Sequence, residues 1–374
     1  MLTKYHQPQD LPLNGLSLDA NKFMKEKSAA EYALGQLQGS GGEGYGKRFF
    51  NPALLISPLA TKEATVSSKM EGTISTVSDV YKYEAGKAPE YSGTAEVANY
   101  RRAISQAIFL LRQEKKIDKA FLRMIHRTLL TGVRHRGTLG DFRRKDVWIG
   151  ERENDPIEKA IYVPPKFMSV ETYIENLLEY LEKGVDDPLT KVAIIHYQFE
   201  AIHPFEDGNG RIGRLLIPLI LYLNKRISLP ILYMSGYFES HRDEYLTSLH
   251  EVDKTSRYEE WLRFFFRSAS EQLQETQRLI NNINKLYDET YERSKGKLKL
   301  KSPYLLPFLA YLFEHPVFNP TKVMQDLGST YNPIAGLIKI FQDAGIITQE
   351  HPGVSSDKRF KLYSFDKLLS LLTS

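Results

Sequence analysis

The chain contains no cysteine, which excludes disulfides, thiolate metal sites and cysteine nucleophiles together. It also lacks a charge excess, because 50 Lys and Arg face 46 Asp and Glu, giving a net charge of +4. Nucleic-acid coats and membrane-surface proteins usually carry a strong field of one sign, so the balance argues against both classes. No uncharged apolar run of about 18 residues occurs, and the N-terminus lacks the apolar stretch of a signal peptide. We expect a soluble cytoplasmic protein that does not bind membranes.

The remaining composition suits ordinary globular cores, with 42% hydrophobic residues in 374. At roughly 150 residues per domain, this length predicts two to three domains. Apolar residues recur mainly at helical spacing, so the predicted fold class is mainly α. Helices are predicted over 19–37, 58–83 with a break at Gly72, 94–126, 189–201, 211–224, 240–251 and 258–287.

Two stretches break the helical pattern and suggest the domain organisation. A glycine-rich connector covers 39–46, and a short basic stretch with a glycine covers 294–301. These borders predict an N-terminal helix and connector over 1–50, a helical core over 51–293 and a small C-terminal domain over 302–374. Within the core, segments 147–150 and 160–165 are predicted to form a small β-hairpin that prolines end.

The C-terminal domain is predicted to contain three helices and two strands. The helical patterns cover 303–314, 321–327 and 332–344, and the strand patterns cover 346–350 and 359–364. Three helices followed by a hairpin is the order of a winged helix-turn-helix.

Segment 203–214, with the sequence HPFEDGNGRIGR, gathers groups that suit polyphosphate chemistry. The Gly-Asn-Gly run 208–210 tolerates left-handed backbone, so its amide N–H groups can form an anion-binding nest. The helix predicted to follow would point its N-terminal amides and positive dipole end at the same anion. Arg211 and Arg214 lie three residues apart on one helix face, where two guanidiniums can clamp separate phosphate groups.

Two more side chains of this segment suit transfer to a hydroxyl group. An ordinary imidazole has a pKa of about 6.5, so His203 can accept a proton from a hydroxyl at neutral pH. Asp207 is a hard oxygen ligand, suited to Mg²⁺ that bridges phosphate oxygens. Phe205 lies between polar residues and is expected to point inward as an anchor. Each part alone is commonly a turn or a solvated face, and their conjunction predicts a nucleotide site.

Segment 203–214 resembles, position for position, the motif of Fic-domain proteins. The resemblance implies a Fic-type helical bundle that transfers AMP from ATP to a Ser, Thr or Tyr hydroxyl of target proteins and of itself, releasing pyrophosphate. It makes His203 the general base and Asp207 the Mg²⁺ ligand, while the side chain of Asn209 would assist phosphate binding. The ATP-binding residues implied by the match are Gly208, Asn209, Gly210, Arg211, Ile212, Gly213 and Arg214.

The resemblance extends to an inhibitory helix, expected at about residues 58–72, where Ser67 is followed by three residues and then Glu71 and Gly72. A glutamate that reaches Arg214 would occupy the guanidinium intended for the terminal phosphate of ATP. The hairpin, about 147–165, corresponds to the flap on which Fic proteins bind an extended target segment as an added strand.

The region around 237–245 corresponds loosely to the part of the Fic fold that encloses adenine. Its candidates are Tyr237, Ser240 and Tyr245. Aromatic residues at helical spacing also fit a plain core, and this alternative stays open.

Other functions remain open beside protein adenylyltransferase activity restrained by Glu71. The same site could remove AMP with a water molecule, or transfer the terminal phosphate if ATP docks reversed. A winged helix also suggests a DNA-binding regulator, but residues 301–374 hold seven Lys or Arg against six Asp or Glu, which argues against DNA. The apolar residues of 332–344 instead favour packing against a partner or a second copy, so a homodimer stays open.

Overall fold

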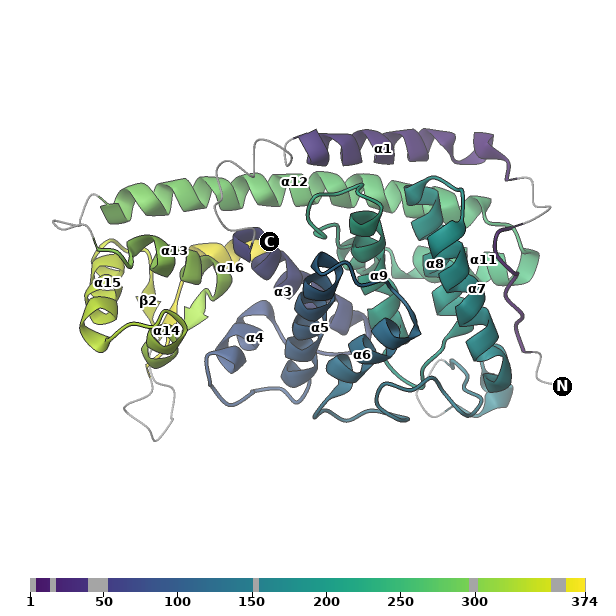
Figure 1. Ribbon diagram of the computed structural model, residues 1–374, viewed down its shortest axis with the longest axis horizontal. Helices are drawn as coiled ribbons and strands as arrows, with labels where there is room; N and C mark the ends of the chain where they lie inside the picture. Colours follow the sequence, from purple (N-terminus) through teal and green to yellow (C-terminus); the bar gives the residue numbers. More distant parts are fainter. Residues whose placement is uncertain are drawn as a thin grey trace. The chain divides into compact units, whose positions relative to one another are not determined.

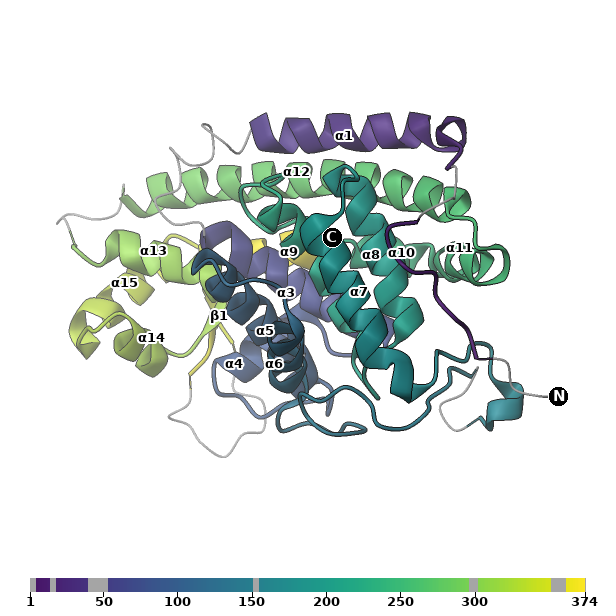
Figure 2. The same ribbon diagram turned by 45° about the vertical axis from the view of Figure 1, so that its right-hand side comes forward.

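The computed structural model describes residues 5–13, 18–39, 53–150, 155–295, 302–350 and 361–373, and its fold is mainly helical, as predicted (Figures 1 and 2). The chain forms two compact units: unit 1 comprises residues 1–41 and 99–274, and unit 2 comprises 42–98 and 275–374. Residues 40–46 of the predicted connector and 296–301 of the predicted boundary lie outside the described residues. The three predicted domains therefore stay a prediction.

Unit 1 holds the helices that follow the N-terminal segment and those that surround the predicted site. In chain order they are η1 (Ala20–Lys22), α1 (Met24–Gly39), α5 (Thr94–Arg112, whose first five residues belong to unit 2), α6 (Lys119–Leu130), η3 (Ile157–Lys159), η4 (Phe167–Ser169), α7 (Val170–Lys183), α8 (Pro188–Ile202), α9 (Asn209–Leu223), α10 (Ser235–Ser240), α11 (Arg242–Thr255) and the first part of α12 (Glu259–Lys295).

Helices α8 and α9 form the centre of unit 1 and lie side by side, with α7 along α8 (Figures 1 and 2). The start of α8 follows from its sequence, because the Asp187 side chain accepts from the Thr190 N–H at 3.1 Å and Pro188 occupies the first turn. Both helices are buried on nearly all faces, as their apolar composition requires. The loop between them therefore stands on a rigid pair of core helices.

The structure differs from the sequence predictions for unit 1 in three respects. The flap is not a two-stranded hairpin: its limbs meet at a single bridge between Ile149 and Tyr162, and η3 follows Pro156. Proline residues lack the N–H that a continuous ladder needs, which explains the short pairing. The single helix predicted over 94–126 is two helices, α5 and α6. The helix predicted over 240–251 corresponds to α11, while α7 and α10 were not predicted. Residues 151–154 of the flap lie outside the described part.

Unit 2 combines two helices that lie, in the sequence, between the two segments of unit 1 with the C-terminal part of the chain. Its elements are α3 (Ala53–Met70), α4 (Val77–Glu84), the end of α12, α13 (Leu305–Glu314), β1 (Val317–Phe318), α14 (Pro320–Asp326), α15 (Tyr331–Asp343), β2 (Thr348–Gln349), β3 (Tyr363–Ser364) and α16 (Asp366–Thr373). The strands form a small antiparallel sheet in the order β1-β3-β2. The three predicted helices and the β2–β3 pair are confirmed, while β1 and α16 were not predicted.

Helices α3 and α4 pack on the C-terminal elements of unit 2. The α3 helix contacts α13 and α16, and the Ser57 hydroxyl donates to the Glu314 carbonyl at 2.9 Å. The α4 helix contacts β1 and α16, and Lys322 donates to the Glu84 carbonyl at 2.7 Å. The segment expected to be inhibitory thus folds as one compact unit with the C-terminal elements.

In the described ranges, no helix is both long and apolar enough to cross a bilayer.

Candidate active site

The loop between α8 and α9 turns through two left-handed residues. His203 ends α8 with φ of +49° and ψ of +62°, and its N–H donates to the Phe199 carbonyl at 3.0 Å. Gly208 precedes α9 with φ of +79°, where glycine avoids the steric cost of a side chain. A positive φ is uncommon for a residue with a β-carbon and often marks a functional position. The backbone thus presents the predicted base at a fixed, strained turn.

Phe205 anchors the loop, as predicted from its place between polar residues. Its side chain is fully buried, and its ring stacks on the His126 ring of α6 at 4.0 Å between centroids. The Gly140 N–H donates to His126 Nδ1 at 2.9 Å, so the ring proton of neutral His126 sits on Nε2. Burial lowers the pKa of His126 to about 4, partly offset by the Asp207 backbone. At neutral pH the loop therefore rests on an uncharged imidazole.

Asn209 closes the loop through its side chain. The Phe205 N–H donates to Asn209 Oδ1 at 2.8 Å, and Asn209 Nδ2 donates to the Phe205 carbonyl at 2.9 Å. Both polar atoms of this buried amide hold the backbone of the loop. A direct contact of the Asn209 side chain with phosphate stays a prediction, and the observed geometry assigns it a shaping role.

The N-terminus of α9 combines positive and negative groups. Arg211 is buried, and its Nη2 lies 3.2 Å from Asp207 Oδ1. The Asp207 side chain keeps about a third of its surface exposed (31%). Amides in the first turn of a helix have no intrahelical acceptor, and here they follow the left-handed Gly208. An anion with several oxygens could be bound here by the first amides of α9 and the Arg211 guanidinium. The Asp207 carboxylate lies within the same turn and could share a cation with that anion.

One exposed carboxylate fits Mg²⁺ that is mainly held by a nucleotide, because Mg²⁺ commonly takes one or two carboxylates plus phosphate oxygens. Among the residues that the structure describes, no group of three or more His, Asp or Glu is arranged as a metal site of its own. Asp207 is therefore the residue that would hold the ion. The Mg²⁺ site itself stays a prediction.

Behind the first turn of α9, His196 links three helices. Its Nδ1 faces the Gly213 carbonyl at 3.1 Å, and its Nε2 faces the Tyr245 hydroxyl at 3.0 Å. Since Gly213 offers only a carbonyl, Nδ1 donates and Nε2 accepts from Tyr245. Burial lowers the pKa of His196 to about 3, so the ring is neutral at physiological pH. This network fixes the turn of α9 that carries Arg214, which is itself buried.

The three residues predicted to contact adenine differ in their surroundings. Tyr245 is buried, and its ring stacks on Phe238 at 4.5 Å, as the core alternative expects. Tyr237 stacks on His241 at 4.0 Å, and its hydroxyl accepts from Arg267 Nε at 3.1 Å. The Ser240 hydroxyl donates to the Gly236 carbonyl at 3.0 Å. Adenine binding by these residues stays a prediction.

Sequence reasoning overlooked two residues that reach the turn of His203. The Arg143 guanidinium is fully buried and donates to backbone carbonyls of this turn and of the flap, including that of His203 at 2.9 Å. Burial lowers the pKa of Arg143 to about 10, so it stays charged at neutral pH. The Tyr162 hydroxyl of the flap donates to the Ala201 carbonyl at 2.7 Å. Because charged residues follow Arg143 at 144, 145 and 146, a buried arginine here gives no distinct sequence signal.

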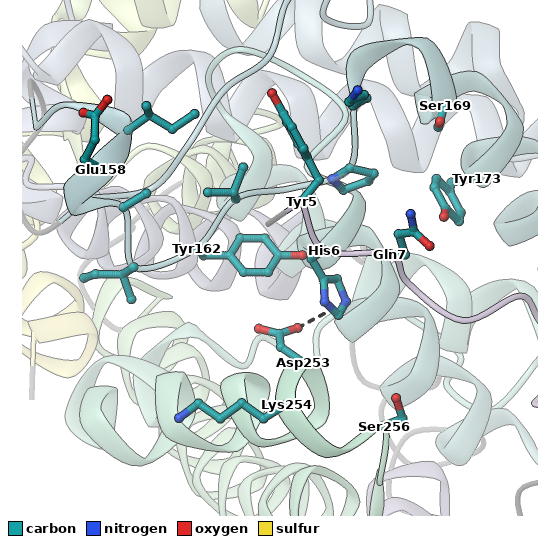
Figure 3. A pocket seen from close by; sticks show the side chains of 16 residues that line it. Tyr5, His6, Gln7, Glu158, Tyr162, Ser169, Tyr173, Asp253, Lys254 and Ser256 are labelled. Carbon is teal, nitrogen blue, oxygen red and sulfur yellow. Dashed lines mark ion pairs between the residues drawn. The ribbon is translucent and has the colours of Figure 1, made fainter. Parts of the chain in front are cut away.

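Tyr162 also lines a cleft of about 1260 Å³ (Figure 3). It is lined by the N-terminal segment at Tyr5–Gln7, the second limb of the flap, the start of α7 and the end of α11. The His6 N–H donates to the Val163 carbonyl at 2.8 Å, and the His6 ring pairs with Asp253 at 3.6 Å. None of the residues lining this cleft belongs to segment 203–214. The cleft is thus separate from the predicted reaction centre.

Glu71 lies in unit 2, directly after the last residue of α3. Its N–H donates to the Ser68 carbonyl at 3.0 Å, and Gly72 follows with φ of +93°. Glu71 and Arg214 belong to different compact units, so the expected contact between them stays a prediction.

Comparison with known proteins assigns the chain to a family. Residues 116–221 match the Fic/DOC family, and residues 24–109 match the Fic/DOC family N-terminal region. The chain belongs to the Fic/DOC family. Members of this family are typically AMPylating transferases, so the resemblance carried by segment 203–214 is confirmed at the level of the family.

The Fic relatives are distant and cover limited parts of the chain. A probable protein adenylyltransferase of Aquifex aeolicus is 28% identical over 205 residues, covering 53% of this chain and 59% of that protein. The protein adenylyltransferase of Caenorhabditis elegans is 41% identical over 88 residues, covering 20% of this chain and 16% of that protein. A match to less than two thirds of each relative leaves their whole activity, substrates and partners as proposals here.

Solved structures support the fold. The crystal structure of a Fic family protein from Desulfovibrio desulfuricans superposes with a TM-score of 0.59 at 20% identity, covering 91% of this chain and 95% of that chain. A Fic domain containing signaling protein from Bacteroides thetaiotaomicron gives 0.52 at 18% identity, covering 70% of this chain and 96% of that chain. At these identities the likeness shows a mainly helical Fic fold.

Proposed function

We propose that this Fic protein transfers AMP from ATP to a Ser, Thr or Tyr hydroxyl of target proteins and of itself. The observation that carries the proposal is the loop between α8 and α9. One short turn holds an imidazole at a left-handed position, a partly exposed carboxylate and the first amides of a helix with a buried arginine. Substrate and base placed in one geometry remove much of the entropic barrier to attack on phosphorus.

In the proposed reaction, His203 takes the proton of the target hydroxyl as its oxygen attacks the α-phosphorus. The bond to the β-phosphate oxygen breaks, and pyrophosphate leaves. The amides of 208–211 and the guanidiniums of Arg211 and Arg214 hold the phosphate oxygens and oppose the charge that develops on them. Mg²⁺ at Asp207 would neutralise the phosphates. The target's extended segment would lie along the flap.

We also propose that Glu71 restrains this activity by competing for Arg214 with the terminal phosphate of ATP. The order α13, β1, α14, α15, β2, β3 supports interpreting residues 302–374 as a winged helix. In α15 the apolar residues Ile334, Leu337, Ile338 and Phe341 are buried, which supports a packing role for that helix rather than DNA reading.

The test uses the full chain with α-labelled ATP and Mg²⁺. The wild-type protein is expected to label itself weakly, Glu71→Gly strongly, and Glu71→Gly with His203→Ala not at all. Equal labelling of all three would overturn the scheme. Mass spectrometry of a cell lysate treated with Glu71→Gly would then locate the target and the modified hydroxyl.

Parallel reactions with γ-labelled ATP distinguish the other reactions of this site. Label from the γ-position on protein would mean phosphate transfer, and loss of α-label from a modified protein would mean AMP removal. A DNA mobility shift at low salt, where electrostatic binding is strongest, would support the DNA-binding regulator instead.

A further inference from the structure

Arg143 spreads its guanidinium over three parts of unit 1. Its Nε donates to the His203 carbonyl at 2.9 Å, and its Nη2 donates to the Ile202 carbonyl at 3.4 Å. The same Nη2 donates to the Pro165 carbonyl at 2.5 Å, at the end of the flap. Its Nη1 donates to the Lys145 carbonyl at 3.3 Å, ahead of the flap's first limb. One rigid, planar group therefore joins both ends of the flap to the turn of the base.

The backbone and neighbours of Arg143 strengthen this junction. Its own N–H donates to the Pro204 carbonyl at 2.9 Å, so side chain and backbone together serve residues 202–204. Asp146 lies 3.9 Å from Nη1 and accepts from the Phe167 N–H at 2.9 Å and from the Tyr5 hydroxyl at 2.8 Å. The charge of Arg143 is thus balanced by a carboxylate that is itself fixed to the segment after the flap.

Burying a cation such as the Arg143 guanidinium is costly unless hydrogen bonds and an opposite charge compensate for the lost water. Four carbonyl acceptors in different directions suit a guanidinium, whose five N–H groups form a rigid fork, whereas a lysine presents one compact ammonium group. The acceptors include the carbonyl of His203, whose φ of +49° is unfavourable for a residue with a side chain. The contact therefore helps to hold a strained conformation on which the direction of the imidazole depends.

We propose that Arg143 is a positioning residue that fastens the flap to the His203 turn, so that the target hydroxyl and the imidazole meet in one geometry. The inference rests on the proposed AMP transfer. It predicts that Arg143 governs the rate of transfer while leaving ATP affinity nearly unchanged, because none of its described partners lies in segment 208–214.

The experiment compares Arg143→Lys and Arg143→Met in the Glu71→Gly chain, with Arg144→Met as the matched control. Arg144 is the next residue, its side chain is 85% exposed, and it pairs with Asp141 at 3.6 Å. Arg143→Met is expected to lower kcat for AMP transfer about a hundredfold, as a misplacement of roughly 1 Å does. Arg143→Lys is expected to recover about tenfold of that loss, because it keeps the charge but not the fork. KM for ATP should change less than about threefold, and Arg144→Met should match its parent.

Stability and NMR separate positioning from general damage. Tryptophan fluorescence in urea gives the folded fraction, and a kcat loss that merely follows this fraction would overturn the inference. Histidine-selective NMR of the ATP-free variants should show a changed His203 ring resonance, with His196 unchanged. This second measurement does not need AMP transfer. If the parent fails to transfer AMP, the proposed function fails, whereas an unchanged His203 resonance in Arg143→Met refutes the role of Arg143.

Discussion

The two buried histidines of unit 1 should make its stability fall in mild acid. In the folded state burial lowers the pKa of His126 to about 4 and that of His196 to about 3. In the unfolded chain both rings would titrate near the ordinary value of about 6.5. The unfolded state therefore binds more protons as pH falls below about 6.5, and the folded state loses stability until its own histidines protonate.

The magnitude follows from the separation of these values. pH 5 lies about 1.5 units below the pKa of an unfolded histidine, so the unfolded ring is protonated there, while either folded ring remains mostly neutral. At about 1.36 kcal/mol per unit this is about 2 kcal/mol for each histidine, and about 4 kcal/mol for both. A domain is commonly stable by roughly 5–15 kcal/mol, so a loss of this size is readily measured.

The assay is urea unfolding followed by tryptophan fluorescence at pH 7.5 and pH 5. Both tryptophans of the chain, Trp148 and Trp261, lie in unit 1, and the Trp261 ring lies 5.7 Å from that of His196. His126→Asn should reduce the loss between the two pH values by about 2 kcal/mol, because the asparagine oxygen can still accept from the Gly140 N–H but does not titrate.

Carboxylates titrate in every variant, so the informative quantity is the difference in acid-induced loss between His126→Asn and wild type. His241→Asn, at a residue that the structure shows exposed, provides the control for replacing a histidine by asparagine. If His126→Asn loses as much stability as wild type between pH 7.5 and pH 5, the explanation by buried neutral imidazoles is refuted.

Three further predictions concern the loop and unit 2. Gly208→Ala should cost unit 1 about 1–2 kcal/mol in urea, because φ of +79° is unfavourable with a β-carbon, and an unchanged midpoint would contradict this. Asn209→Ala leaves the N–H and carbonyl of Phe205 without their side-chain partner, so the same assay should show a loss of about 2–4 kcal/mol in the free energy of unfolding. A loss below about 0.5 kcal/mol would contradict the role of the Asn209 side chain in holding the loop. Leu312→Ala, at a fully buried side chain of α13, should cost unit 2 about 2–5 kcal/mol and speed hydrogen exchange in α3, whereas faster exchange confined to α13 would contradict their joint folding.

Local patterns were sufficient to predict most helices and the turn between α8 and α9. Asp187 and Pro188 mark the N-terminus of α8 in the sequence. The left-handed backbone at Gly208 was expected because glycine permits it. The inward direction of Phe205 followed from its polar neighbours. Hydropathy could not distinguish a two-stranded flap from two limbs that share one bridge, because pairing there is limited by prolines and not by the apolar pattern.

Long-range partners were beyond local sequence reasoning. Arg143 meets carbonyls about 20 and 60 residues away, and such a partner is chosen by the tertiary fold rather than by neighbours in sequence. The contact of α3 with α13 likewise joins segments that lie before and after residues 99–274 in the sequence. Composition shifts predict borders along the sequence. The compact units could not be predicted in this way, because each unit is formed by two segments that are separate in the sequence.

Segment 203–214 divides its residues by task, which a motif match alone does not show. The side chains of Phe205 and Asn209 point into the protein. Phe205 stacks on His126, and the Asn209 amide hydrogen-bonds to the loop backbone. Asp207 keeps exposed surface beside the first amides of α9, where a phosphate and its cation would arrive. Loss of an inward residue should therefore appear first as lost stability. Loss of an outward residue should appear as lost chemistry in a protein that remains folded, and the urea and labelling assays measure these effects separately.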